Sequence, residues 1–197
     1  ATSITSVKTV DGSKAEGKLD LDLDNATAAI LKTVKTGSGN DTVTLSSSNG
    51  LVVASGTTIN LGAGNDKLLA GDGSVAASTT TVIDGGAGID SLDAILVNVG
   101  NAGVFASFET LSLTTTGSNL DLNLVKKSTF TTIALDGATA STVRNVSTSQ
   151  SLAVNVNNAA ANTELLFKNV DGKADAYTIN FNADNAANTN AGTVVVD

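Results

Sequence analysis

The sequence predicts an all-β fold, a parallel β-solenoid in which short strands stack coil upon coil. Three observations predict it. A motif rich in glycine and aspartate recurs at nearly constant spacing, short β-type runs flank each copy, and no helical crossover separates them. Repeats with a period of about 20 to 50 residues are typical of solenoids, in which each coil buries its apolar side chains against the next.

The composition restricts both the core and the chemistry. Of the 197 residues, 41% are apolar and 3% aromatic, and Trp, Met, Cys, His and Pro are absent. Such a core consists of Val, Leu, Ile, Ala and a few Phe, which suits narrow repeated layers. Without His and Cys the chain lacks Ser-His and Cys-His pairs, thiol nucleophiles, disulfides and the usual zinc sites, whereas carboxylate-based hydrolysis would still be possible. We expect the protein not to be an enzyme.

The charge is acidic and indicates the class of partner. The formal net charge is -8, from 19 acidic and 11 basic residues, and the only adjacent basic pair is Lys126-Lys127. This pattern argues against nucleic-acid binding and favours a solvated extracellular surface or binding of a hard cation. No apolar run approaches 18 residues, so we expect no membrane span. The absence of any Met predicts a fragment of a longer protein.

Residues 1–35 form the first predicted segment, an N-terminal strand and cap. The alternating run Leu19–Leu23 predicts a half-buried strand. Asn25–Leu31 follows it, and we expect one helical turn or an irregular cap over the first coil.

Residues 36–100 carry the repeated motif. The three copies are TGSGNDTVT (Thr36–Thr44), LGAGNDKLL (Leu61–Leu69) and GGAGIDSLD (Gly85–Asp93). Each contains G-x-G-x-D with an apolar residue two places after the aspartate. The spacing between Asp41, Asp66 and Asp90 is 25 and then 24 residues, which predicts one motif per coil.

β-type runs flank each motif on both sides. The runs before the motifs are Leu31–Lys35, Thr57–Leu61 and Thr80–Asp84, and those after them are Thr42–Leu45, Lys67–Ala70 and Ser91–Val97. Each repeat is therefore predicted to be strand, glycine turn, strand and a variable return rich in Ser, Asn and Gly.

Residues 101–197 lack the glycine motif but keep the rhythm of strands. The predicted strands are Phe108–Thr114, Leu120–Val125, Phe130–Asp136, Ser151–Val156, Glu164–Val170, Ala176–Asn182 and Gly192–Val196. Alternation of apolar and polar residues is clear in several of them, as expected of half-buried strands. We expect the solenoid to continue through this part without metal motifs, so that the chain is one elongated domain.

The spacing of glycine and aspartate suits calcium. Glycine allows successive carbonyls of a turn to face one side, and calcium takes six to eight oxygen ligands at about 2.3–2.6 Å. Turn carbonyls and one aspartate supply about half of such a set, and the next coil supplies the rest. Asp41 and Asp66 would flank one site, and Asp66 and Asp90 the next. The predicted metal-site residues are Thr36, Gly37, Ser38, Gly39, Asp41, Leu61, Gly62, Ala63, Gly64, Asp66, Gly85, Gly86, Ala87, Gly88 and Asp90, with Asp72 or Asp93 in a terminal half-site.

These motifs resemble the RTX nonapeptide G-G-x-G-x-D-x-U-x of calcium-binding, type I-secreted bacterial proteins. Gly85–Asp93 fits every fixed position, whereas the other copies have Thr36 and Leu61 in place of the first glycine. The resemblance implies a β-roll-like solenoid with calcium in its glycine-rich turns. The usual RTX β-roll has two nonapeptides per coil and calcium on both sides. One motif per coil predicts a single column of calcium on one edge and wider coils.

The segment FETLSLT after the repeats and the composition rich in Thr, Asn, Ala and Val resemble S-layer proteins of Gram-negative bacteria. This resemblance implies a secreted structural protein of the bacterial cell surface, in which calcium makes the solenoid rigid and supports assembly into a lattice. The implied partners are calcium, further copies of the chain and a cell-surface polysaccharide. An RTX adhesin or ligand-binding module is the alternative, followed by the C-terminal calcium domain of a type I-secreted enzyme.

Overall fold

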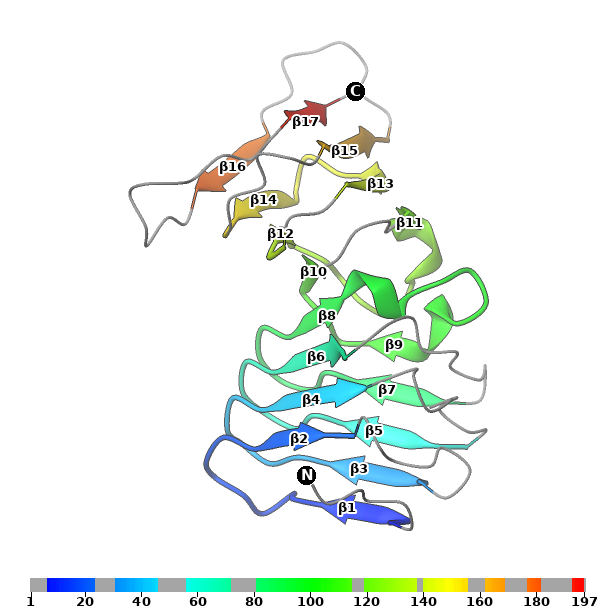
Figure 1. Cartoon of the computed structure of the whole chain (residues 1–197), viewed down its shortest axis with the longest axis vertical. Helices are drawn as coiled ribbons and strands as arrows, with labels where there is room; N and C mark the ends of the chain where they lie inside the picture. Colours follow the sequence, from blue (N-terminus) through cyan, green and yellow to red (C-terminus); the bar gives the residue numbers. More distant parts are fainter. Residues whose placement is uncertain are drawn as a thin grey trace.

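The chain folds as an all-β, parallel β-solenoid, which confirms the predicted fold class (Figure 1). The computed structural model describes residues 7–23, 31–45, 56–71, 81–114, 119–137, 140–155, 162–168, 177–181 and 193–196. Across these residues every neighbouring pair of strands is parallel, and they form three sheets of eight, five and four strands. No helix within these ranges is long and apolar enough to cross a bilayer.

The eight-stranded sheet takes one strand from each coil and extends along the whole solenoid. Its strands are β2 (Asp20–Asp22), β4 (Thr42–Leu45), β6 (Lys67–Ala70), β8 (Ser91–Asp93), β10 (Thr110–Leu113), β12 (Thr132–Leu135), β14 (Ser151–Val154) and β16 (Thr178–Phe181). This sheet passes without interruption from the glycine-rich repeats into the part of the chain that lacks them. The described strands after residue 100 therefore stack on the same sheet as those of the glycine-rich repeats.

A second face of the solenoid changes along the chain. The five-stranded sheet of the first half contains β1 (Thr9–Asp11), β3 (Thr33–Lys35), β5 (Thr58–Asn60), β7 (Val82–Asp84) and β9 (Phe105–Ala106). The four-stranded sheet of the second half contains β11 (Asn119–Asp121), β13 (Ser141–Val146), β15 (Asn162–Phe167) and β17 (Thr193–Val196). In the first half the glycine turns join the two sheets along one edge of the stack (Figure 1).

The core is a column of apolar side chains in strict register. Each strand of the eight-stranded sheet from β4 to β14 places one aliphatic side chain above the next: Val43, Leu68, Leu92, Leu111, Ile133 and Leu152. All six are fully buried. A one-residue slip would turn these side chains to the opposite face, so the column fixes the register of the coils.

Most predicted strands are present, several of them shorter by one to three residues, and the strand predicted at Glu164–Val170 lies at Asn162–Phe167. Two others were wrong in extent. Ser91–Val97 ends as a strand at Asp93, and Leu120–Val125 is strand only to Asp121. In both cases the aspartate side chain accepts the backbone N–H two residues later and starts a 3₁₀ turn, η1 (Ala94–Leu96) or η3 (Leu122–Leu124). Such local side-chain bonds compete with the ladder of a sheet.

Other elements were not predicted or lie outside the described residues. The strands β1, β9 and β13 and the 3₁₀ turn η2 (Ala102–Val104) were not recognised in the sequence. β13 contains a bulge at Asn145, whose φ of 59° breaks the alternation expected of a strand. The predicted N-terminal cap falls outside the described residues apart from Leu31, which is buried in the core.

Candidate metal centre

The three glycine turns stack directly on one another between the two sheets. The Ala63 N–H donates to the Gly37 carbonyl at 2.9 Å, and the Ala87 N–H donates to the Gly62 carbonyl at the same distance. Gly88 has a φ of +143°, and a Cβ there would overlap the Gly64 carbonyl oxygen. Glycine is therefore required both by the backbone conformation and by the close approach of the neighbouring coil.

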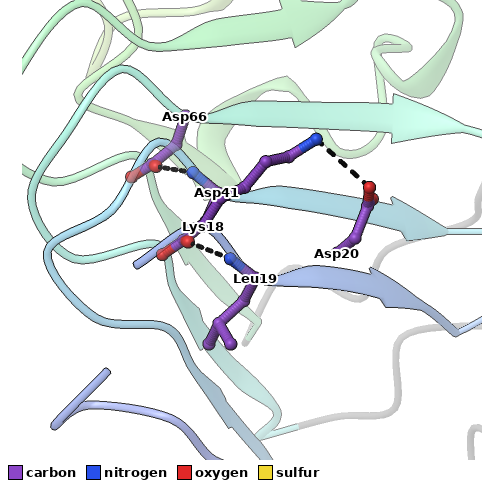
Figure 2. Close-up of polar contacts among 5 residues, drawn as sticks. All are labelled: Lys18, Leu19, Asp20, Asp41 and Asp66. Atoms are coloured by element: carbon purple, nitrogen blue, oxygen red, sulfur yellow. Dashed lines mark hydrogen bonds and ion pairs between the residues drawn. The ribbon is translucent and has the colours of Figure 1, made fainter. Parts of the chain in front are cut away.

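The aspartates of the three motifs form a column inside these turns. Asp41, Asp66 and Asp90 are each at most 1% exposed. The Oδ1 of Asp41 accepts the Leu19 N–H at 2.7 Å, and that of Asp66 accepts the Asp41 N–H at 2.7 Å (Figure 2). The Oδ1 of Asp90 accepts the Asp66 N–H at 2.8 Å. Each carboxylate thus holds the backbone of the coil before it, and the structure brings the three predicted aspartates together.

A fourth carboxylate, Glu109, continues the column and was not recognised in the sequence. Its Oε2 accepts the Asp90 N–H at 2.9 Å. Glu109 immediately precedes β10, just as each aspartate immediately precedes its strand of the eight-stranded sheet, and Thr110 pairs with Ser91. The distance of 19 residues from Asp90 and the missing glycines concealed this equivalence. We call Asp41, Asp66, Asp90 and Glu109 the carboxylate ladder.

The second carboxylate oxygens of the ladder differ in their surroundings. The Oδ2 of Asp41 accepts the Gly37 N–H at 3.1 Å. The Oδ2 atoms of Asp66 and Asp90 are buried and have no hydrogen-bond partner within the described part of the chain. A buried polar atom without a partner carries a desolvation cost of about 1–3 kcal/mol, more when it is charged.

The residue two places before the turn glycine explains this difference. Asn60 Oδ1 accepts the Gly62 N–H at 2.9 Å, and Asp84 Oδ1 accepts the Gly86 N–H at 3.1 Å. In the first motif this position is Lys35, whose side chain has no acceptor. The turn glycine therefore donates to an aspartate of the ladder only in the first motif, where the Gly37 N–H donates to Asp41.

The ladder concentrates uncompensated negative charge. The pKa of Asp66 is raised to about 6, mainly by burial and to a smaller extent by the charges of Asp90 and Asp41, while the hydrogen bond from the Asp41 N–H acts in the opposite direction. Burial also raises the pKa of Asp90, with contributions from Glu109 and Asp84. The ammonium group of Lys18, near the first rung, pairs instead with exposed Asp20 at 3.2 Å (Figure 2).

These features fit a bound calcium ion. Two buried carboxylate oxygens that have no donor in the described part of the chain, next to further acidic groups, provide the hard anionic oxygen ligands that calcium prefers. Asp66 and Asp90 would hold the ion. No cluster of three or more acidic, His or Cys side chains suited to a metal occurs among the described residues, so backbone carbonyls and water would complete the set. The ion would supply the positive charge that the ladder lacks.

Other predicted site residues have structural roles or lie elsewhere. Thr36 is buried, and its hydroxyl donates to the Leu61 carbonyl, while the Ser38 N–H donates to the Ala15 carbonyl at 2.9 Å. Asp72 falls outside the described residues.

Asp93 lies at the far end of β8 from Asp90, apart from the ladder. Its oxygens accept the Thr114 hydroxyl at 2.7 Å, the Ala70 N–H at 3.3 Å and the Ile95 N–H at 3.3 Å. Burial raises its pKa against these hydrogen bonds. Asp93 therefore has protein donors at both oxygens, unlike Asp66 and Asp90.

A second, exposed ladder of asparagines runs beside the carboxylates and also was not predicted. Asn40 Oδ1 accepts the Asn65 N–H at 2.8 Å, and Asn65 Oδ1 accepts the Ile89 N–H at 2.9 Å. The sequence signal was the N-D pair that two of the three motifs share. The asparagines hold the outer side of the turns without adding charge.

No family model, curated protein or solved structure matches this chain, so the assignment of the site rests on its own residues and geometry.

Proposed function

We propose that this chain is a structural, calcium-binding segment of a secreted bacterial S-layer protein. Calcium orders the solenoid, and the ordered solenoid contributes to a surface lattice. The observation that carries the proposal is a pair of buried oxygens on adjacent coils, Asp66 Oδ2 and Asp90 Oδ2, neither of which has a hydrogen-bond partner among the described residues. The RTX-like motifs in which both aspartates lie support calcium as the ion.

The proposed role of calcium is to make the stacked turns stable at neutral pH. Adjacent strands of a sheet lie about 4.8 Å apart, so ionised carboxylates on neighbouring coils repel each other. A bound cation converts this repulsion into attraction and couples folding to metal binding. Such a chain folds fully only where calcium is abundant, as it is outside the cell.

Assembly into a lattice is the second part of the proposal. The repetitive fold presents exposed apolar side chains at two loops, Ile89 in the third glycine turn (60% exposed) and Val99 (82% exposed). Single apolar side chains of this kind are common on surfaces. We propose them as contact points between neighbouring copies of the chain. Type I secretion and a location at the cell surface follow from the resemblance to RTX and S-layer proteins.

A calcium titration tests the proposal. Far-UV circular dichroism and isothermal titration calorimetry would follow the full chain from chelator into calcium, with magnesium as the control ion. We expect a calcium-specific gain of β signal with at least one bound ion, since magnesium requires a stricter octahedral geometry. Complete β structure in chelator with no calcium uptake would contradict the proposal.

A polar pocket favours an adhesin as the second candidate function. The pocket lies in the second half of the solenoid, has a volume of about 240 Å³ and is lined by side chains that include Asn123, Asn145, Gln150 and Lys168. Amide, hydroxyl and ammonium groups of this kind suit a saccharide with an acidic substituent. Binding of acidic oligosaccharides, lost in Lys168→Ala, would favour this function.

A further inference from the structure

The geometry points to Glu109 as the terminal carboxylate of a cation site that it forms with Asp90, at the end of the ladder away from Asp41. This inference rests on the proposed function, because it assigns a further residue to the same calcium column. It places a ligand in a segment that carries no glycine motif. It also makes the ladder directional, with one cation site between Asp66 and Asp90, one between Asp90 and Glu109, and none between Leu19 and Asp41.

The position of Glu109 is fixed by the backbone on both sides. Its N–H donates to the Asp90 carbonyl at 3.1 Å, and its carbonyl accepts the Thr131 N–H at 2.8 Å. Its side chain reaches back to the Asp90 N–H, as each aspartate reaches back to the coil before it. Glu109 is half-buried, so the residue is partly open to solvent, from which an ion can approach.

The charge of Glu109 is not needed for that hydrogen bond. A neutral glutamine oxygen would accept the same N–H. The carboxylate adds a negative charge beside Asp90, whose Oδ2 is fully buried and without a hydrogen-bond partner among the described residues. If Glu109 served only as a hydrogen-bond acceptor, its negative charge would destabilise the ladder. As a ligand of a cation, the same charge is useful. The next residue in register, Thr131, has no carboxylate, and the ladder ends there.

At the Asp41 end of the ladder, backbone donors satisfy the carboxylate, so no cation is needed there. At Asp41 both oxygens have backbone donors, the N–H groups of Leu19 and Gly37. The rung below Asp41 is Leu19, which has no acidic group. Backbone N–H groups thus satisfy both carboxylate oxygens of Asp41. At the other end, Asp90 and Glu109 bring two negative charges together, and Asp90 Oδ2 has no donor among the described residues.

The experiment compares calcium binding by the wild-type chain, Glu109→Gln and Glu16→Gln. Glu16 is exposed in the loop between β1 and β2, so its substitution removes the same charge at a distance from Glu109 along the solenoid. Calorimetry would give the number and affinity of calcium ions, and thermal unfolding in chelator would give a readout that needs no metal. We expect E109Q to lose one ion or to bind at least tenfold more weakly. We also expect it to unfold at a higher temperature than the wild type in chelator, while E16Q is unchanged in both respects.

The outcomes separate this inference from the proposed function. Calcium binding by the wild type with E109Q equal to E16Q in number and affinity of ions would overturn the role of Glu109 and leave the proposed function intact. No calcium binding by the wild type would overturn both. Circular dichroism of E109Q in calcium would show that its β content is retained, as the preserved hydrogen-bond acceptor requires.

Discussion

Lys35 and Asn60 lie side by side in β3 and β5 and are paired in register. The difference between these two side chains decides how the next turn is satisfied. The Asn60 side chain accepts the N–H of its turn glycine, Gly62. The Lys35 side chain has no acceptor, so the N–H of Gly37 donates to Asp41 instead. The residue at this strand end thus decides whether the aspartate six residues later has a glycine donor or is left to a cation.

Asp66→Asn is expected to stabilise the chain in chelator and to weaken its response to calcium. The amide oxygen can still accept the Asp41 N–H, while the charge beside Asp41 and Asp90 is removed. Thermal unfolding with and without calcium measures both effects. A lower unfolding temperature in chelator would show that repulsion within the ladder is insignificant.

Asp41→Asn is expected to act in the opposite direction and serves as the matched control. Both oxygens of Asp41 accept backbone N–H groups, so an amide would place one NH₂ group against a donor. We expect a loss of about 1–3 kcal/mol of unfolding free energy in calcium and in chelator alike. Urea unfolding under both conditions measures it, and equal behaviour of D41N and D66N would contradict the distinction between the two rungs.

The calcium-free protein is expected to become more stable as the pH falls from 7 to about 4.5. Burial raises the pKa of Asp66 to about 6 in the folded state, from an ordinary value of 3.8. A raised pKa means that the folded state holds its proton more tightly, so this contribution to stability is complete below about pH 4 and is lost as the pH rises through 6. Asp90 and Asp93 shift in the same direction. Unfolding temperatures across this range in calcium-free buffer test it, and D66N should flatten the profile.

Gly88→Ala is expected to destabilise the stacked turns by about 2 kcal/mol or more. A side chain at a φ of +143° is strained, and its Cβ would overlap the carbonyl of the coil before it. Gly103→Ala is the control, because a Cβ at Gly103 meets nothing within 4 Å and its φ is not positive. Equal unfolding free energies for the two variants would mean that the turns are not stacked as described.

Phe108→Ala is expected to cost about 3–5 kcal/mol of unfolding free energy. Phe108 is fully buried just before β10, where the five-stranded sheet ends and the coil changes shape. Val99→Ala, at a side chain 82% exposed, should change stability by less than about 0.5 kcal/mol. Chemical unfolding at constant calcium concentration compares them, and similar values would place Phe108 outside the core.

The fold was predictable because the motif fixes both the period and the register. Three G-x-G-x-D copies place Asp41, Asp66 and Asp90 on adjacent coils, and the apolar residue after each aspartate joins one buried column. Strand ends were less predictable because they depend on single side chains. Asp93 and Asp121 each divert the chain into a 3₁₀ turn, and an aspartate looks the same in sequence whether it caps a turn or occupies a strand.

The candidate site was predictable only in part. The sequence identified the three aspartates but gave them equal roles, since it does not show which N–H each oxygen accepts. Glu109 could not be identified because its equivalence to Asp90 depends on the pairing of Thr110 with Ser91. That pairing follows from the packing of the coils, since no repeated glycine marks it.

The direction of the ladder also means that each coil is completed by the coil that follows it in the chain. Every carboxylate accepts an N–H from the coil before it, over separations of 22, 25, 24 and 19 residues. A chain cut short after any of these coils therefore leaves the backbone of its last coil incomplete. The glycine-rich coils are completed at Glu109, so a chain that ends before this residue leaves the Asp90 N–H without this acceptor.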